Sequence, residues 1–83
     1  MIDDYNIEQH ILKNMDDLCN KLEEESSLST LYTKERYNGE LYIHFRIYNT
    51  VNNELVKNRF DKLIHAYNYL QGIYFGIKFI KEG

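Results

Sequence analysis

The sequence contains one cysteine, no proline and no tryptophan among its 83 residues. A single cysteine, Cys19, excludes an internal disulfide and a cysteine-cluster zinc site, so packing alone must hold the fold together. No apolar run approaches the roughly 18 residues that a membrane-spanning helix needs, and the first residues lack the basic start and apolar stretch of a signal peptide. These absences predict a cytoplasmic protein without a membrane anchor.

The sequence also lacks the usual motifs of catalytic and cofactor sites. It has no Gly-x-Ser-x-Gly, no His-Glu-x-x-His, no phosphate-binding glycine loop and no dinucleotide fingerprint. The histidines His10, His44 and His65 are not spaced as metal ligands are. Cys19 falls on the apolar side of a predicted helix, where a thiol usually packs. We therefore expect a protein that is not an enzyme and that holds no cofactor and no metal.

The residues that are present indicate one folded domain. Hydrophobic residues make up 43%, aromatic residues 14% and charged residues 28% of the chain, and the net charge is −3. With no proline, no Ser/Gly linker and no repeat, residues 1–83 are predicted to form a single small domain. Charge is uneven, because residues 1–27 carry eight acidic residues against two lysines, while the remainder is mildly basic.

Apolar residues near the start of the chain recur at helical spacing, and they are Ile7, Ile11, Met15, Leu18 and Leu22. This spacing predicts a helix from about residue 6 to about residue 25. Three consecutive glutamates fall at its end, where the helix dipole disfavours negative charge. They form either a frayed, solvated end or part of an acidic surface for a basic partner. That candidate surface consists of Asp16, Asp17, Glu23, Glu24 and Glu25.

Asn38-Gly39 lies between two runs rich in β-branched and aromatic residues, which predicts a hairpin over about residues 29–48. A two-residue turn at Asn38-Gly39 would place cations on the same face as the apolar residues of the second strand. A three-residue turn over residues 37–39 separates the two kinds of side chain, so we predict that register. It assigns to the core face Leu31, Thr33, Leu41, Ile43, Phe45 and Ile47.

Helical spacing returns in the second half of the chain, at Val56, Phe60, Leu63, Tyr67 and Leu70. It predicts a helix over about residues 52–71 that ends at Gly72. The period then changes to two, which predicts a strand over about residues 73–80, parallel to the second strand through a right-handed crossover. The predicted fold is α+β in the order α-β-β-α-β, with two helices packed on one face of a three-stranded mixed sheet.

The predicted open face of this sheet combines aromatic and basic side chains, namely Tyr32, Lys34, Arg36, Tyr42, His44, Arg46, Tyr48 and Tyr74. Such a surface can stack unpaired bases, can bind a protein, or can simply cover a half-wet sheet. The negative net charge and the absence of a glycine-containing RNA-recognition strand around residues 42–45 favour a protein partner.

The leading hypothesis is a small acidic, non-catalytic regulator or inhibitor that binds a protein through the acidic helix or the sheet face. The abundance of Asn, Ile, Tyr and Lys is typical of an AT-rich genome, and it favours a phage or mobile-element protein acting on a host nucleic-acid-binding or defence protein. One alternative is a domain that binds single-stranded RNA or DNA. The other is a homodimeric structural or assembly protein that pairs through its last strand.

Overall fold

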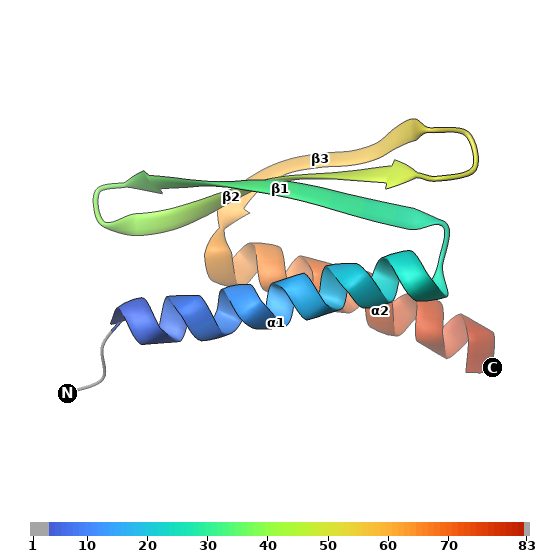
Figure 1. Ribbon diagram of the computed structural model, residues 1–83, viewed down its shortest axis with the longest axis horizontal. Helices are drawn as coiled ribbons and strands as arrows, with labels where there is room; N and C mark the ends of the chain where they lie inside the picture. Colours follow the sequence, from blue (N-terminus) through green and yellow to red (C-terminus); the bar gives the residue numbers. More distant parts are fainter. Residues whose placement is uncertain (1–3, 83) are drawn as a thin grey trace.

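The computed structural model describes residues 4–82. Its elements are the helix α1 (Asp4–Glu25), the strands β1 (Leu28–Tyr37), β2 (Glu40–Asn49) and β3 (Glu54–Lys62), and the helix α2 (Leu63–Glu82). The sheet order is β1-β2-β3, and both pairs are antiparallel. Both helices lie on one side of the sheet (Figure 1). The predicted α+β fold with two helices and three strands is confirmed, but the sheet is antiparallel throughout and not mixed.

Helix α1 matches the helix predicted over about residues 6–25. Met15 and Leu22 are completely buried on its inner face, as their spacing predicts. Ser26 terminates the helix, because its Oγ donates to the carbonyl oxygen of Leu22 at 2.5 Å and accepts from the backbone N–H of Leu28 at 3.2 Å. The chain then turns directly into β1.

The β1–β2 hairpin has a two-residue turn, so the predicted three-residue turn is wrong. Asn38 and Gly39 have φ angles of 49° and 82°, and Tyr37 pairs with Glu40. An Asn-Gly pair with two positive φ angles matches the twist of the flanking strands and needs no bulge. Turn geometry therefore decides the register, although it places cations of β1 on the same face as the apolar residues of β2.

This register changes which side chains of β1 face the helices. Leu31 lies opposite Arg46 and is 62% exposed, so its predicted place in the core is wrong. Tyr32 lies opposite Phe45 on the helix side. Polar and apolar side chains can share the helix side of the sheet because β1 is an edge strand. Its polar side chains lie beside α1, while the core forms over β2.

Residues 54–62 form a strand where the sequence predicted the first half of a helix. Asn53 adopts a φ of 60° and donates its backbone N–H to the carbonyl oxygen of Asn49 at 2.7 Å, which closes the turn before β3. A bulge next to Ile47 and Tyr48 leaves Val56 without a direct partner on β2. Strand β3 supplies hydrogen-bond partners for the backbone groups along the second edge of β2, which a helix could not do.

The predicted strand over residues 73–80 is wrong, because α2 continues through Gly72 to Glu82. The buried residues Leu63, Ala66, Leu70 and Tyr74 step by three, four and four, which sets one inner face for the helix. The alternation of side chains after Gly72 is too short to distinguish a strand from a helix. Packing of the inner face of α2 decides in favour of the helix. The parallel crossover and the pairing through a last strand are therefore also wrong.

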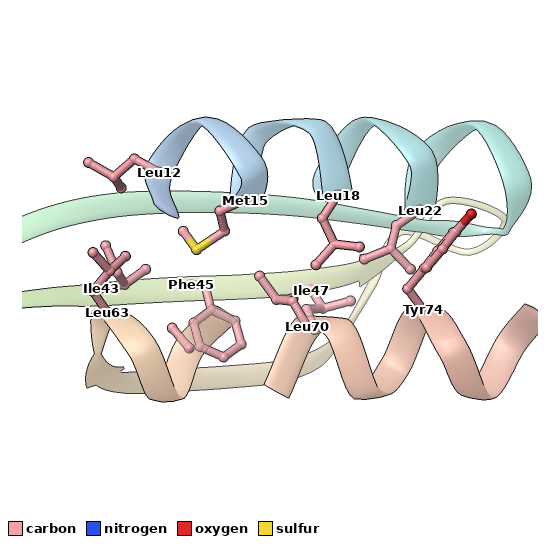
Figure 2. Packing of buried hydrophobic residues seen from close by; sticks show 11 residues of the cluster. Leu12, Met15, Leu18, Leu22, Ile43, Phe45, Ile47, Leu63, Leu70 and Tyr74 are labelled. Carbon is pink, nitrogen blue, oxygen red and sulfur yellow. The ribbon is translucent and has the colours of Figure 1, made fainter. Parts of the chain in front are cut away.

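The core lies between the two helices and β2 (Figure 2). Side chains from α1, β2 and α2 point into the same layer, and Phe45 is completely buried at its centre. The two helices run in the same direction (Figure 1). Glu8 near the start of α1 and Leu63 at the start of α2 line the same hollow, and Glu25 in the last turn of α1 binds Tyr74 in the second half of α2. The cluster comprises Leu12, Met15, Leu18, Leu22, Ile43, Phe45, Ile47, Leu63, Ala66, Leu70 and Tyr74.

Candidate protein-binding face

The sheet separates the eight residues predicted to share one face. Four of them, on β2, alternate with buried residues of that strand and so lie on the side away from the helices, and they are Tyr42, His44, Arg46 and Tyr48. Tyr32, Lys34 and Arg36 instead lie on the helix side of β1, because the register differs by one residue from the predicted one. Tyr74 belongs to α2 and is buried in the core.

Two of the displaced side chains bind acids of α1. Arg36 donates from Nη2 to both carboxylate oxygens of Glu8, at 3.2 Å each. The hydroxyl of Tyr32 donates to the carboxylate of Asp16. Burial and this hydrogen bond raise the pKa of Tyr32 above its usual value. Part of the predicted basic platform therefore pairs with the acidic helix of the same molecule.

The predicted acidic surface is partly used by the fold. Besides Asp16, Glu25 accepts a hydrogen bond from the hydroxyl of Tyr74 at 2.8 Å, which joins the last turn of α1 to α2. Asp17, Glu23 and Glu24 are exposed. Lys21 approaches the ring of Tyr74, with Nζ 6.0 Å from the ring centroid, and brings a cation to the same end of the molecule. All five predicted acids are exposed to solvent, and the carboxylates of Asp16 and Glu25 also bind tyrosine hydroxyls of the same molecule.

The uncovered side of the sheet carries apolar and aromatic side chains from all three strands. We call this surface the open face, and its large residues are Leu31, Tyr37, Tyr42, His44, Arg46, Tyr48, Leu55 and Phe60. Sequence reasoning missed four of them. Leu31 was assigned to the core, Tyr37 to the turn, and Leu55 and Phe60 to a helix. The Asn-Gly turn was the signal that would have placed Leu31 correctly.

An aromatic cluster occupies one end of the open face. Tyr42 and Phe60 stack nearly parallel, with ring centroids 5.3 Å apart and planes 5° apart. Tyr37 meets the edge of this pair, at 5.7 Å from Tyr42 and 6.2 Å from Phe60. His44 lies on the other side, 6.3 Å from Phe60, and its Nε2 is 2.6 Å from the side-chain oxygen of Asn58. The rings fix one another, so the cluster is preorganised.

The other end of the open face is apolar and shallowly hollowed. Leu31 is 62% and Leu55 51% exposed, and the two lie on opposite sides of Tyr48. One hollow lies beside Leu31 and is also lined by His44 and Arg46. A second hollow, on the other side of Leu31, reaches Tyr48 and the turn before β3. These hollows offer concave sites for side chains of a partner.

Charges on the open face nearly balance, which differs from the predicted basic platform. Lys62 places Nζ 3.1 Å from a carboxylate oxygen of Glu40, and this pairing raises the pKa of Lys62. Tyr37 donates its hydroxyl to Glu35 at 2.8 Å, which raises the pKa of Tyr37. Arg46 is the remaining arginine on this surface, at its centre. The face is therefore aromatic and apolar, with paired charges at one end and Arg46 at the centre.

The structure also places the metal-ligating side chains and the thiol of Cys19. Within residues 4–82 no cluster of three or more His, Cys, Asp or Glu side chains could hold a metal ion. Burial, and secondarily the charge of Asp16, raises the pKa of the Cys19 thiol to about 11, so the nucleophilic thiolate is scarce at neutral pH. Neither described helix combines the length and the apolar character that crossing a membrane requires.

Comparisons with models of protein families, with curated proteins and with solved structures found no match to this chain. Function must therefore be inferred from the open face and from the charges that surround it.

Proposed function

We propose that this protein is a non-catalytic binding module that docks a partner protein onto its open face. The observation that carries this proposal is the contiguous exposure of large apolar side chains on one side of the sheet. Leu31, Leu55 and Phe60 are 62%, 51% and 48% exposed, and they come from the two edge strands β1 and β3 of the same surface. Contiguous apolar patches on soluble proteins commonly mark interaction sites.

The composition of the open face fits a protein interface. Tyrosine and arginine are the residue types most enriched among binding hot spots, and Tyr42 and Arg46 lie near the middle of this surface. Three strands spaced about 4.8 Å apart, each with a rise of about 3.3 Å per residue, give a face of roughly 500 Å². With a polar rim this approaches the roughly 800 Å² per partner of a standard interface.

Charge disfavours the alternative that the open face binds single-stranded nucleic acid. The stacked pair of Tyr42 and Phe60 resembles a platform for bases, and this observation keeps the alternative testable. However, Lys34 and Arg36 lie on the helix side, while Glu35 and Glu40 lie on the open face. A phosphate backbone would meet these carboxylates beside the rings, so a protein partner fits the surface better.

Regulation or inhibition of a nucleic-acid-binding or defence protein is a narrower form of this proposal. In that form the exposed acids of α1, Asp17, Glu23 and Glu24, occupy a basic groove on the partner. These acids lie on the helix layer, away from the open face (Figure 1). The two surfaces can therefore be tested separately in one experiment.

The test is affinity purification of the tagged full chain from its native host, with and without nuclease. Four baits are compared: the wild type, the open-face variant Leu31→Ser/Phe60→Ser, the acidic variant Asp17→Lys/Glu23→Lys/Glu24→Lys, and the control Val51→Ser. Val51 is 81% exposed in the turn before β3, so it matches the loss of an apolar side chain outside the open face. Each bait is first checked for an unchanged circular dichroism spectrum.

The proposal expects one protein that survives nuclease, is lost with the open-face variant, and is retained by the other three baits. Loss with the acidic variant alone would move the binding site to α1. Loss of all recovery after nuclease treatment would favour the nucleic-acid alternative and contradict the proposal. Binding of the recovered protein is then measured with purified components, and the open-face variant is expected to weaken it at least tenfold.

A further inference from the structure

The outer edge of β1 has no neighbouring strand, because β1 pairs with β2 along its other edge. The hairpin determines which backbone groups of β1 stay unpaired. Tyr37 and Glu40 close the two-residue turn as a hydrogen-bonded pair. Hydrogen-bonded and non-hydrogen-bonded pairs then alternate along an antiparallel ladder. Thr30, Tyr32 and Lys34 therefore direct their backbone N–H and C=O groups away from β2.

Leu28 agrees with this alternation, since it stands two residues before Thr30. Its N–H donates to the Oγ of Ser26 at 3.2 Å and not to β2. Among the turn and loop bonds of residues 4–82, no backbone-to-backbone hydrogen bond involves Thr30, Tyr32 or Lys34. An open edge of this kind is a template on which an extended segment can add a strand.

The first half of β1 is less protected against such pairing than the other edge strand, β3. Natural edge strands commonly carry charged side chains that discourage the addition of a further strand. Five of the nine residues of β3 are charged. Residues 28–33 of β1 carry no charge, and the charged residues of β1 begin at Lys34. The uncharged part of the open edge is therefore residues 28–33.

Hollows lie on both sides of this edge. One separates β1 from α1, and its lining includes Asp16, Cys19, Asn20, Thr30, Tyr32 and Lys34. Two more lie on the open face, and Leu31 lines all three. An added strand would lie about 4.8 Å from β1 and would direct alternate side chains to opposite sides of the sheet. Both sets of hollows are thus within reach of its side chains.

We propose that the outer edge of β1 binds an extended segment of the partner protein, which adds as a fourth strand along residues 28–34. This inference rests on the proposed function, since it specifies how the partner reaches the open face. Seven residues span about 20 Å at a rise of about 3.3 Å per residue. The outward groups of Thr30, Tyr32 and Lys34 would bind the backbone of the segment. Its apolar side chains would lie beside Leu31.

Charge specifies the side chains that the segment directs toward α1. Asp16 and Glu23 are exposed, and they lie seven residues apart on the same side of α1. Lys34 lines the hollow at its hairpin end, and Lys13 precedes Asp16 by one turn toward that end. The hollow is therefore negative near Leu28 and positive near the hairpin. We expect a segment with a basic side chain near Leu28 and none near Lys34.

A segment of another protein fits this edge better than β1 of a second copy. Helix α1 runs alongside β1, which it contacts through Asp16 and Tyr32 and through Glu8 and Arg36 (Figure 1). Antiparallel pairing of β1 with itself, about a two-fold axis perpendicular to the sheet, would bring the two α1 helices side by side. Each α1 carries seven acidic residues and two lysines, so the helices would repel one another.

The test selects random nine-residue peptides, displayed on phage, against the full chain and measures the selected synthetic peptides by calorimetry. Thr30→Pro and Lys34→Pro each remove one outward N–H and keep the bonds to β2, and an edge strand tolerates proline at such positions. Thr30→Val and Lys34→Ala keep the N–H and are the matched controls. Each variant must first show an unchanged midpoint of thermal unfolding. We expect the proline variants to weaken peptide binding at least tenfold and the controls less than threefold.

Amide hydrogen exchange, measured by NMR on the wild type, gives a readout that needs no variant. Exchange at Thr30, Tyr32 and Lys34 should slow at least tenfold when a selected peptide binds. Leu31 and Thr33 already bond to β2 and should change less. Failure of the library to yield a binder, or slower exchange without this alternation, would overturn the proposal. A wild type that doubles its mass in sedimentation, with the doubling lost in Thr30→Pro, would overturn it in favour of self-pairing.

The partner recovered by affinity purification separates this inference from the proposed function. Thr30→Pro and Lys34→Pro are added as baits, and both are expected to lose the partner. Retention by both, together with loss by Leu31→Ser/Phe60→Ser, would overturn the added strand and leave docking on the open face in place. Retention by Leu31→Ser/Phe60→Ser would contradict the proposed function itself.

Discussion

Arg36 on β1 and Glu8 on α1 form a bidentate contact, with Nη2 of the arginine 3.2 Å from each carboxylate oxygen. Arg36 also donates from Nη1 to the carbonyl oxygen of Gly39 at 3.0 Å, which ties the same side chain to the hairpin turn. The contact holds a cation on the helix side of the sheet. It is one reason why the open face is nearly neutral and aromatic.

A double-mutant cycle over Arg36→Ala and Glu8→Ala should give a small coupling free energy. The Arg36 side chain is 48% exposed, and exposed ion pairs contribute about 0.2–1 kcal/mol. The free energy of unfolding in urea is measured for the wild type, both single variants and the double variant. The coupling should shrink in 1 M NaCl, since salt screens exposed charges. A coupling of zero at low salt would show that the pair does not form in solution.

Truncation of Phe45 and of Leu31 should have very different effects on stability. Phe45→Ala opens a cavity in the core and should lower the free energy of unfolding by about 3–5 kcal/mol. Leu31→Ala removes a side chain that is 62% exposed and should cost less than about 1 kcal/mol. The three-residue turn would bury both side chains, so a large loss for Leu31→Ala in chemical denaturation would contradict the observed register.

Alanine at Gly72 should stabilise the monomer. The position is helical and has open space around a Cβ atom, so Gly72→Ala should raise the free energy of unfolding by about 0.5–1 kcal/mol. Thermal unfolding is followed by circular dichroism at a concentration where the protein is monomeric. Gly39→Ala is the opposite control, because Gly39 has a φ of 82° and alanine there should destabilise. Destabilisation by both substitutions would contradict a helix at residue 72.

The thiol of Cys19 should react slowly, and the protein should lose stability at alkaline pH. Burial raises the pKa of Cys19 to about 11 from 9.0, so the folded state keeps a proton that the unfolded state releases. This stability is fully present below about pH 9 and is lost as the pH rises toward 11. Alkylation by iodoacetamide at pH 8 should be at least tenfold slower than in urea.

Cys19→Ala is the control for the pH dependence. It should remove part of the loss of unfolding free energy between pH 9 and 11. The rest should persist, since the pKa of Tyr32 is also raised and acts in the same direction. Equal alkylation rates in the folded and unfolded protein would show that Cys19 is exposed.

The sequence predicted the parts of the fold that depend on local patterns. Helix α1 and the Asn38-Gly39 hairpin follow from apolar spacing and turn chemistry, and both are present. The predicted register of the hairpin is wrong because the separation of polar from apolar side chains does not set it. The Asn-Gly turn sets it, and an edge strand can place polar residues such as Arg36 beside a helix. This error of one residue in the register misplaced Leu31, Lys34 and Arg36 together.

The second half of the chain could not be predicted from periodicity. Val56 and Phe60 continue the helical spacing of Leu63 and Leu70, yet they are exposed on β3. Residues 73–80 alternate as a strand does, yet they continue α2. In both segments the deciding interaction is long-range: β2 needs a second strand for its backbone groups, and α2 needs a continuous inner face against α1.

The most direct test of the central claim is site-specific photo-crosslinking in the native host. Benzoylphenylalanine is placed at Leu31 on the open face, at Glu24 on α1, or at Val51 in the turn, all of them exposed positions. We predict that Leu31 yields a crosslink to one protein, and that Glu24 and Val51 yield none to that protein. A crosslink to a protein from Glu24 with none from Leu31 would contradict a binding role for the open face.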